Sequence, residues 1–148
     1  MQIHITNKQQ DLSIDKPYLQ KVVVALANGF NVHFDEMSLH FVSEKKIKEL
    51  HKAFFNDPSS TDCITLPIDP PGQKPYCLLG EVFVCPKVAK AYAASHKLDE
   101  AKEVLLYVIH GFLHLIGYDD MEEEDEKIMR QMESSAFEHL IREGLCSA

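Results

Sequence analysis

Hydrophobic positions along the chain follow two spacings, and the changes between them divide its 148 residues into elements. Alternation with a period of two indicates a half-buried strand, and recurrence every three or four residues indicates an amphipathic helix. Strands are predicted at residues 2–6, 37–42, 62–66 and 81–85. Residues 67–78, between the last two strands, hold four of the seven prolines and are expected to be irregular.

Five segments have the helical spacing: residues 17–27, 44–55, 86–95, from 98 or 99 to about 117, and about 121–143. Ser43 can cap the second helix, whose inner face carries Ile47, Leu50 and Phe54. The fourth helix is apolar on more than one side and is expected to be central. This order of elements predicts an α+β fold, a single domain over residues 1–148 with a small mixed β-sheet packed by about five helices.

The central helix ends in the chain's most informative stretch, His110 to Asp120, which reads H-G-F-L-H-L-I-G-Y-D-D. His110 and His114 lie one turn apart on the same face, where two imidazole nitrogens can bind one metal ion. Two histidines on an apolar helix are more often ordinary core residues than ligands. Gly117 strengthens the metal hypothesis because it can end the helix and let Asp120 return to the same ion.

The spacing copies the H-E-x-x-H-x-x-G-x-x-H helix-turn frame of the metzincin zinc proteases. Gly111 stands in place of the glutamate that activates water there, and Asp120 stands in place of the third histidine. A glycine cannot act as a general base, so peptide hydrolysis by that route is not expected.

Composition and charge narrow the function classes. The chain is 45% hydrophobic and 26% charged, values that are typical of a globular domain. No apolar run is long enough to span a bilayer, and the first residues lack a signal-peptide pattern, so a cytosolic location is expected. The four cysteines show no pairing pattern and are expected to be reduced thiols.

A net charge of −8 argues against a simple nucleic-acid binder. The acidic residues are concentrated at 121–126, however, whereas residues 44–52 carry four lysines against two acids. A local basic face around Lys45, Lys48 and Lys52 can therefore coexist with the acidic total, although charge alone favours an ordinary solvated helix face for both runs.

Three segments resemble the YbeY family of ribosomal RNA maturation factors. Residues 110–119 match every specified position of the family's H-G-x-L-H-L-x-G-Y-D-H signature as far as its final histidine, which falls on Asp120. The segment from Leu50, L-H-K-A-F-F-N-D-P-S-S-T-D-C-I-T-L-P, and residues 79–85, L-G-E-V-F-V-C, resemble two further family motifs. All three occur in the family's order, so the resemblance covers nearly the whole chain.

The resemblance implies a single-strand-specific, metal-dependent endoribonuclease acting in small-subunit ribosomal RNA 3′-end maturation and ribosome quality control. It implies one Zn²⁺ per chain, with His110, His114 and Asp120 as both metal ligands and catalytic residues, and aspartate is a legitimate zinc ligand. The implied partners are the small-subunit ribosomal RNA precursor and the ribosome or its proteins. The implied fold is a small sheet packed by helices.

The family's arginine, the natural phosphate contact near the metal, falls on Phe55, which can stack on a base but cannot neutralise a phosphate. Lys52 and His51 are candidates to replace it, so the expected substrate-binding residues are Lys52, Phe55 and His51. The general base stays open between Asp119, Asp62, Glu81 and an unaided metal hydroxide. Each of these acids also has a structural reading, respectively as a turn former, a strand-entry cap and a solvated strand residue.

Two other functions remain open at this point. The first is a ribosome-associated binding factor with a structural metal and little or no nuclease activity. The second is a metal-dependent hydrolase of another bond, which Gly111 disfavours when that bond is a peptide.

Overall fold

The computed structural model describes residues 1–148 and contains four strands and five helices. The strands are β1 (Gln2–Lys8), β2 (Glu36–Val42), β3 (Cys63–Pro67) and β4 (Leu78–Val84). The helices are α1 (Lys16–Gly29), α2 (Glu44–Phe55), α3 (Pro86–His96), α4 (Glu100–Leu115) and α5 (Glu123–Arg142). Every element predicted from the hydrophobic pattern is present, although β4 begins at Leu78 rather than at residue 81.

The four strands form one mixed sheet in the order β1-β2-β4-β3. β2 runs parallel to β1 and to β4, and β3 runs antiparallel to β4. A parallel pair needs a long crossover, which α1 supplies between β1 and β2. The predicted small mixed sheet is confirmed.

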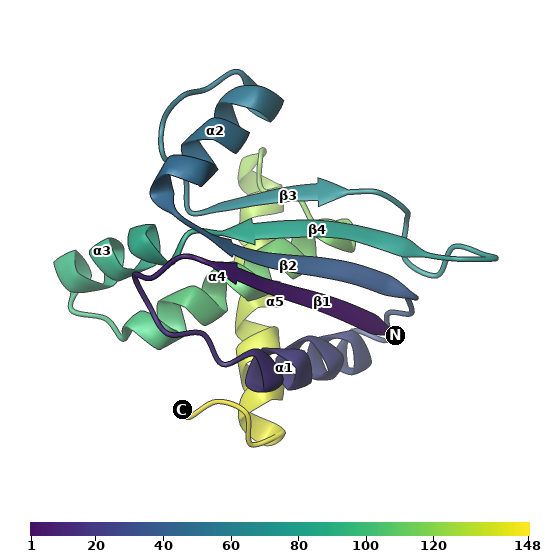
Figure 1. The fold of residues 1–148 in the computed structure, drawn as a ribbon. Coiled ribbons are helices and arrows are strands. Elements are labelled where there is room, and N and C mark those ends of the chain that lie inside the picture. The colour runs from purple at the N-terminus through teal and green to yellow at the C-terminus, as the bar shows by residue number, and fades with distance from the viewer.

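The hydrophobic core lies between the sheet and the helices behind it (Figure 1). Met37, Leu39 and Phe41 of β2 point into this core and are almost fully buried, whereas their neighbours on β2 alternate to the other face of the sheet. Ten of the sixteen residues of α4 are buried, because this helix contacts β3, β4, α3 and α5. The central position predicted for the metal-carrying helix is confirmed.

Helix α2 stands at the β3 edge of the sheet (Figure 1). Ser43 caps it as predicted, since its hydroxyl accepts a hydrogen bond from the Lys46 amide at 3.2 Å. Ile47 is fully buried, but Phe54 is 55% exposed, so the prediction that Phe54 lies on the inner face is wrong. The reason is that α2 packs on the sheet through Ile47 and Leu50, and its last turn rises away from β3.

Two further expectations concern the chain as a whole. All four cysteines are free thiols. None of the five helices combines the length and the apolar character that crossing a membrane requires.

Candidate metal centre

Helix α4 and the turn after it hold the candidate metal ligands. Asp99 caps the start of α4 by accepting a hydrogen bond from the Lys102 amide at 3.1 Å. At the other end, Gly117 has a φ of +109°, a conformation that favours glycine. The Tyr118 amide donates back to the Leu113 carbonyl at 3.0 Å, which closes the turn. The chain thereby reverses, and Asp120 returns to the two histidines.

The ligand atoms of His110, His114 and Asp120 converge on one point. The two Nε2 atoms lie 3.0 Å apart. A carboxylate oxygen of Asp120 lies 3.3 Å from Nε2 of His110, and the other lies 3.6 Å from Nε2 of His114. Tetrahedral zinc at its usual bond length of about 2.0–2.1 Å separates its ligand atoms by about 3.4 Å. Both the donor set and its spacing fit a zinc ion.

Glu133 of α5 fixes the orientation of His110. Its Oε2 lies 2.7 Å from Nδ1 of His110, and because a carboxylate only accepts, Nδ1–H is the donor and Nε2 keeps its lone pair for a metal. Arg130 donates from Nη1 to the other oxygen of Glu133 at 2.8 Å. Burial alone would raise the pKa of Glu133, but the hydrogen bonds from His110 and Arg130 outweigh it, so this pKa is lowered.

The pKa of His110 is raised by the same neighbours. Burial is the largest single influence and lowers it, but the hydrogen bond to Glu133 and the charges of Glu133 and Asp120 together exceed that effect. His110 is therefore surrounded by negative charge, which favours a cation at its Nε2 atom.

Gly111 explains why the metzincin glutamate has no counterpart. A Cβ atom at this position would lie 2.5 Å from Cγ1 of Val82 and 3.2 Å from Sγ of Cys63. The position faces the sheet, and α4 approaches β4 too closely for a side chain. No water-activating carboxylate can occupy it in this fold.

Two cavities reach the metal group. The larger one, about 670 Å³, is lined by Asp62, Tyr92, Leu98, Glu103, Leu106, Tyr107, His110, Asp120, Arg130 and Glu133. The smaller one, about 220 Å³, is lined by His51, Phe55, Cys63, Ile64, Thr65, His110 and His114. The metal group thus lies between a cavity on the side of α3 and α5 and a cavity under α2.

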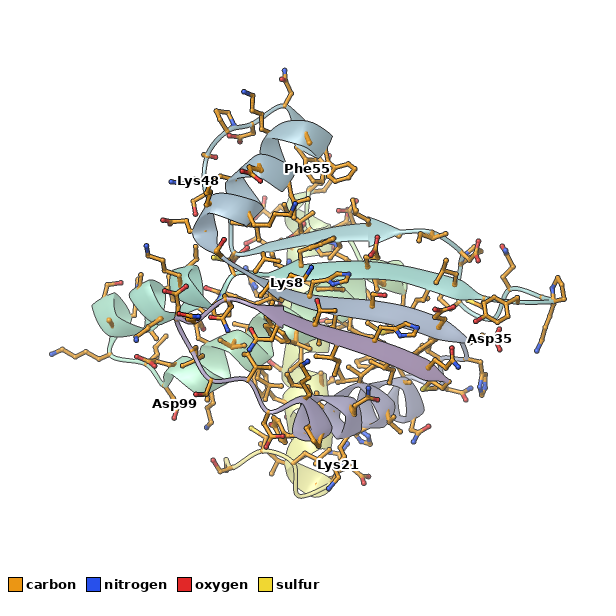
Figure 2. All side chains as sticks on the ribbon, viewed as in Figure 1. Lys8, Lys21, Asp35, Lys48, Phe55 and Asp99 are labelled. Carbon is orange, nitrogen blue, oxygen red and sulfur yellow. The ribbon has the colours of Figure 1, made fainter.

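Of the predicted substrate-binding residues, the structure brings His51 and Phe55 to the smaller cavity but not Lys52. Phe55 is 55% exposed, and its ring lies 5.7 Å from that of His51, with the two planes tilted. Lys52 is exposed and lines neither cavity. Figure 2 shows Lys48 on the opposite side of α2 from Phe55, and its ammonium group lies 4.0 Å from Glu44.

Of the three candidate bases, only Asp62 lines a cavity at the metal group. Asp119 is exposed, and its carboxylate accepts a hydrogen bond from the Asp120 amide at 2.7 Å, which is a turn-forming contact. Glu81 alternates with Val82 on β4 and therefore points to the other face of the sheet, where it lies 3.0 Å from Nε2 of His40. Neither of these two carboxylates is gathered into the site.

Sequence reasoning missed Glu103, Arg130 and Glu133. Glu133 carried a usable signal: it falls among Met129, Ala136 and Leu140 at helical spacing, and all four residues are buried. A carboxylate in an apolar stripe needs a partner, and His110 is that partner.

Comparison with known proteins gives the same picture. The family model described as Endoribonuclease YbeY matches residues 4–141. The chain belongs to the YbeY family. The Endoribonuclease YbeY of Protochlamydia amoebophila (strain UWE25) is 43% identical over 138 residues, which are 93% of this chain and 92% of that protein. The Endoribonuclease YbeY of Chlamydia muridarum is 41% identical over 145 residues, which are 95% and 89% of the two chains.

A solved structure shares the arrangement of elements. The solution structure of TM1509 from Thermotoga maritima aligns with a TM-score of 0.62 at 25% identity, covering 97% of this chain and 94% of that one. The resemblance to YbeY endoribonucleases and the predicted α+β fold are therefore confirmed, and the chain is a member of a family of metal-dependent hydrolases.

Proposed function

We propose that the chain is a single-strand-specific, zinc-dependent endoribonuclease. Its substrate in this proposal is the precursor of the small-subunit ribosomal RNA, cleaved during 3′-end maturation and ribosome quality control, with the ribosome or its proteins as partners. The observation that supports this most directly is that potential metal-ligand atoms of His110, His114 and Asp120 converge on one point in a chain of the YbeY family.

The protein's own groups prepare the site. A zinc ion held by His110, His114 and Asp120 would have three protein ligands, the number found in catalytic rather than structural sites. When bound, it would supply Lewis acidity towards a phosphoryl oxygen and would lower the pKa of a bound water towards about 7. Glu133 holds the Nδ1 proton of His110 and keeps Nε2 turned to the ion. Of the three candidate bases, Asp62 is the one placed to accept a proton, because it lines the larger cavity with His110 whereas Asp119 and Glu81 do not.

Single-stranded RNA suits the two cavities that meet at the ligands. An unpaired strand can turn its bases outward and stack them on aromatic side chains, which a duplex cannot do. Tyr92 and Tyr107 line the larger cavity, and Phe55 lines the smaller one. A strand crossing the metal group can therefore place a base on either side of the scissile phosphate.

One observation favours the alternative, a ribosome-associated binding factor with a structural metal. The smaller cavity has neither lysine nor arginine in its lining. A phosphate on that side would meet no ammonium or guanidinium group of the protein, which would slow a reaction that develops negative charge.

The decisive experiment pairs elemental analysis with an RNA cleavage assay. We expect about one zinc per chain, and we expect His114→Ala or a chelator to remove both the zinc and the cleavage. His33→Ala is the matched control, because His33 is exposed and lies outside both cavities. Cleavage that survives the chelator would contradict the nuclease mechanism, and RNA binding without cleavage in the zinc-loaded protein would favour the binding factor.

A further inference from the structure

The larger cavity extends from the metal group along α4 towards α3. Its volume of about 670 Å³ falls within the range of about 300–1,000 Å³ that is usual for small-ligand sites. Tyr92, Leu98, Leu106 and Tyr107 form its apolar and aromatic part. The rest of the lining is ionisable, and Arg130 is the one lysine or arginine in it. A flat aromatic ligand with polar edges fits this combination.

Two polar side chains in the lining are buried without a protein partner. Glu103 and Tyr107 are each 7% exposed. Neither the carboxylate nor the hydroxyl is hydrogen-bonded to another side chain or to the backbone. Every fully enclosed side-chain oxygen in this protein has a hydrogen-bond partner. Since the oxygens of Glu103 and Tyr107 have none, they are not fully enclosed, and they open onto the cavity that these residues line. Burial and then the charge of Asp62 raise the pKa of both groups, and the charge of His96 on α3 opposes this shift at Glu103.

A carboxylate in this position gains most from a ligand that brings donors. An acceptor at the wall of a cavity gains a hydrogen bond when a ligand brings a donor to it, and the ligand keeps the pairing that its donor had in water. Nothing on α4 competes for the group, since the cap of that helix is made by Asp99 instead. Glu103 is therefore free to recognise something that enters the cavity.

We propose that the cavity is a nucleobase subsite, and that Glu103 selects guanine there. A carboxylate only accepts hydrogen bonds, and guanine presents two adjacent donors, N1–H and N2–H, on its Watson–Crick edge. Adenine and cytosine present one amino group beside an acceptor, and the imino group of uracil is flanked by two carbonyls. Guanine is thus the one base that can make two parallel hydrogen bonds to Glu103. This inference rests on the proposed RNA-cleaving function, which brings nucleotides to the site.

The positions along α4 agree with a neighbouring nucleotide. Glu103, Tyr107 and His110 share one face of the helix, and His110 lies seven positions after Glu103, about 10 Å along the axis. A nucleotide whose base lies at Glu103 can therefore have its phosphate at the metal group or next to it. Arg130 adds positive charge at the metal end, while Glu103 repels phosphate from the base end.

Tyr92 is positioned to stack on such a base. It is 45% exposed, and its ring is held by stacking on the ring of His96 at a centroid distance of 3.9 Å. Stacking does not distinguish bases, because every base has a π face. The two residues therefore have separable effects: Tyr92 contributes affinity and Glu103 contributes selectivity.

The test measures binding of the five nucleoside monophosphates GMP, IMP, AMP, CMP and UMP to the zinc-loaded protein by protein-detected NMR. We expect GMP to bind more tightly than AMP, CMP or UMP by about 5- to 150-fold, the range for a good bidentate contact. IMP, which lacks the 2-amino group, should lie between GMP and the others. Glu103→Gln should remove most of the GMP preference, and Tyr92→Leu should weaken all five ligands by a similar factor.

Glu100→Gln is the matched control, because Glu100 lies one turn away on α4 and outside the cavity. Equal binding of all five nucleotides to the wild type would overturn the proposal, and that comparison needs no variant to fold. An unchanged GMP preference in Glu103→Gln would overturn it as well. The readout is binding, so a failure to cleave RNA contradicts the proposed function, whereas a failure to distinguish GMP contradicts the guanine subsite.

Discussion

The two sides of the metal group differ in how deeply their side chains are buried and in how many hydrogen bonds fix them. On the side of α4 and α5, His110 is hydrogen-bonded to Glu133, which is hydrogen-bonded to Arg130, and Glu133 is only 5% exposed. On the side of α2, Phe54 and Phe55 are each 55% exposed, and this helix meets the sheet through a small separate cluster around Ile47. The α4–α5 side is part of the main hydrophobic core, whereas the α2 side packs only at the edge of the sheet.

This difference predicts which parts of the site tolerate substitution. A ligand built into the core cannot move without disturbing packing, because interiors are dense and transmit strain. A side chain on an exposed helix turn can change identity at little cost to stability. Phe55, where the sequence resemblance places an arginine of the family, lies on such an exposed turn. Substitutions on the two sides should therefore separate metal affinity and stability from substrate binding.

Among residues that are not metal ligands, the largest effect is expected from Glu133→Ala. Removing a group that orients a ligating histidine lowers metal affinity by about 10- to 100-fold. Competition with a coloured zinc chelator measures this, and Glu133→Gln should recover much of the affinity because its amide oxygen still accepts from Nδ1 of His110. Glu138→Ala, at an exposed site on the same helix, is the control. Unchanged zinc affinity in Glu133→Ala would mean that the hydrogen bond from His110 to Glu133 does not contribute to metal binding.

Gly111→Ala is expected to affect stability rather than substrate binding. The new methyl group would lie 2.5 Å from Cγ1 of Val82, and overpacking of this kind costs about 1–3 kcal/mol. An ordinary helical glycine gains about 1 kcal/mol from the same change, so the sign of the result is informative. Urea unfolding measures the free energy. In a Val82→Ala background the same substitution should cost less, and an equal cost there would exclude the steric explanation.

Local patterns were enough to predict much of the fold and the metal group. The elements follow from hydrophobic period, and the metal group follows from a helix repeat and a glycine turn, all within eleven residues from His110 to Asp120. Prediction failed where a side chain's surroundings depend on distant segments. Phe54 has the helical spacing of an inner residue, but it is exposed because the last turn of α2 rises away from β3.

The same limit applies to the polar residues of the site. Glu81 and Asp62 are equally plausible bases in the sequence, and only the pleat of β4 and the β3–α4 contact separate them. Glu133 lies 23 residues after His110 in sequence, and Glu103 looks like an ordinary acid in the first turn of a helix. Their roles depend on the packing of α3 and α5 against α4, and the spacing of hydrophobic residues does not predict which helices pack together.

The smallest effect is expected on the exposed side, from Phe55→Arg. A guanidinium at this position would enter the lining of the smaller cavity and give an RNA phosphate a cation there. Because the site is more than half exposed, the gain should resemble a surface ion pair, about twofold to fivefold in RNA affinity or cleavage rate. The salt dependence of binding should rise by about one phosphate contact.

Lys52→Arg is the matched control, since it places the same group on the same helix outside both cavities, and we expect no gain from it. Lys52→Ala tests the earlier expectation that Lys52 already replaces the arginine: that expectation requires weaker RNA binding and a smaller salt slope. If Lys52→Ala shows both changes while Phe55→Arg shows no gain, the phosphate path crosses the outer face of α2. The smaller cavity would then have no part in holding RNA, and the difference between the two sides of the metal group would concern stability alone.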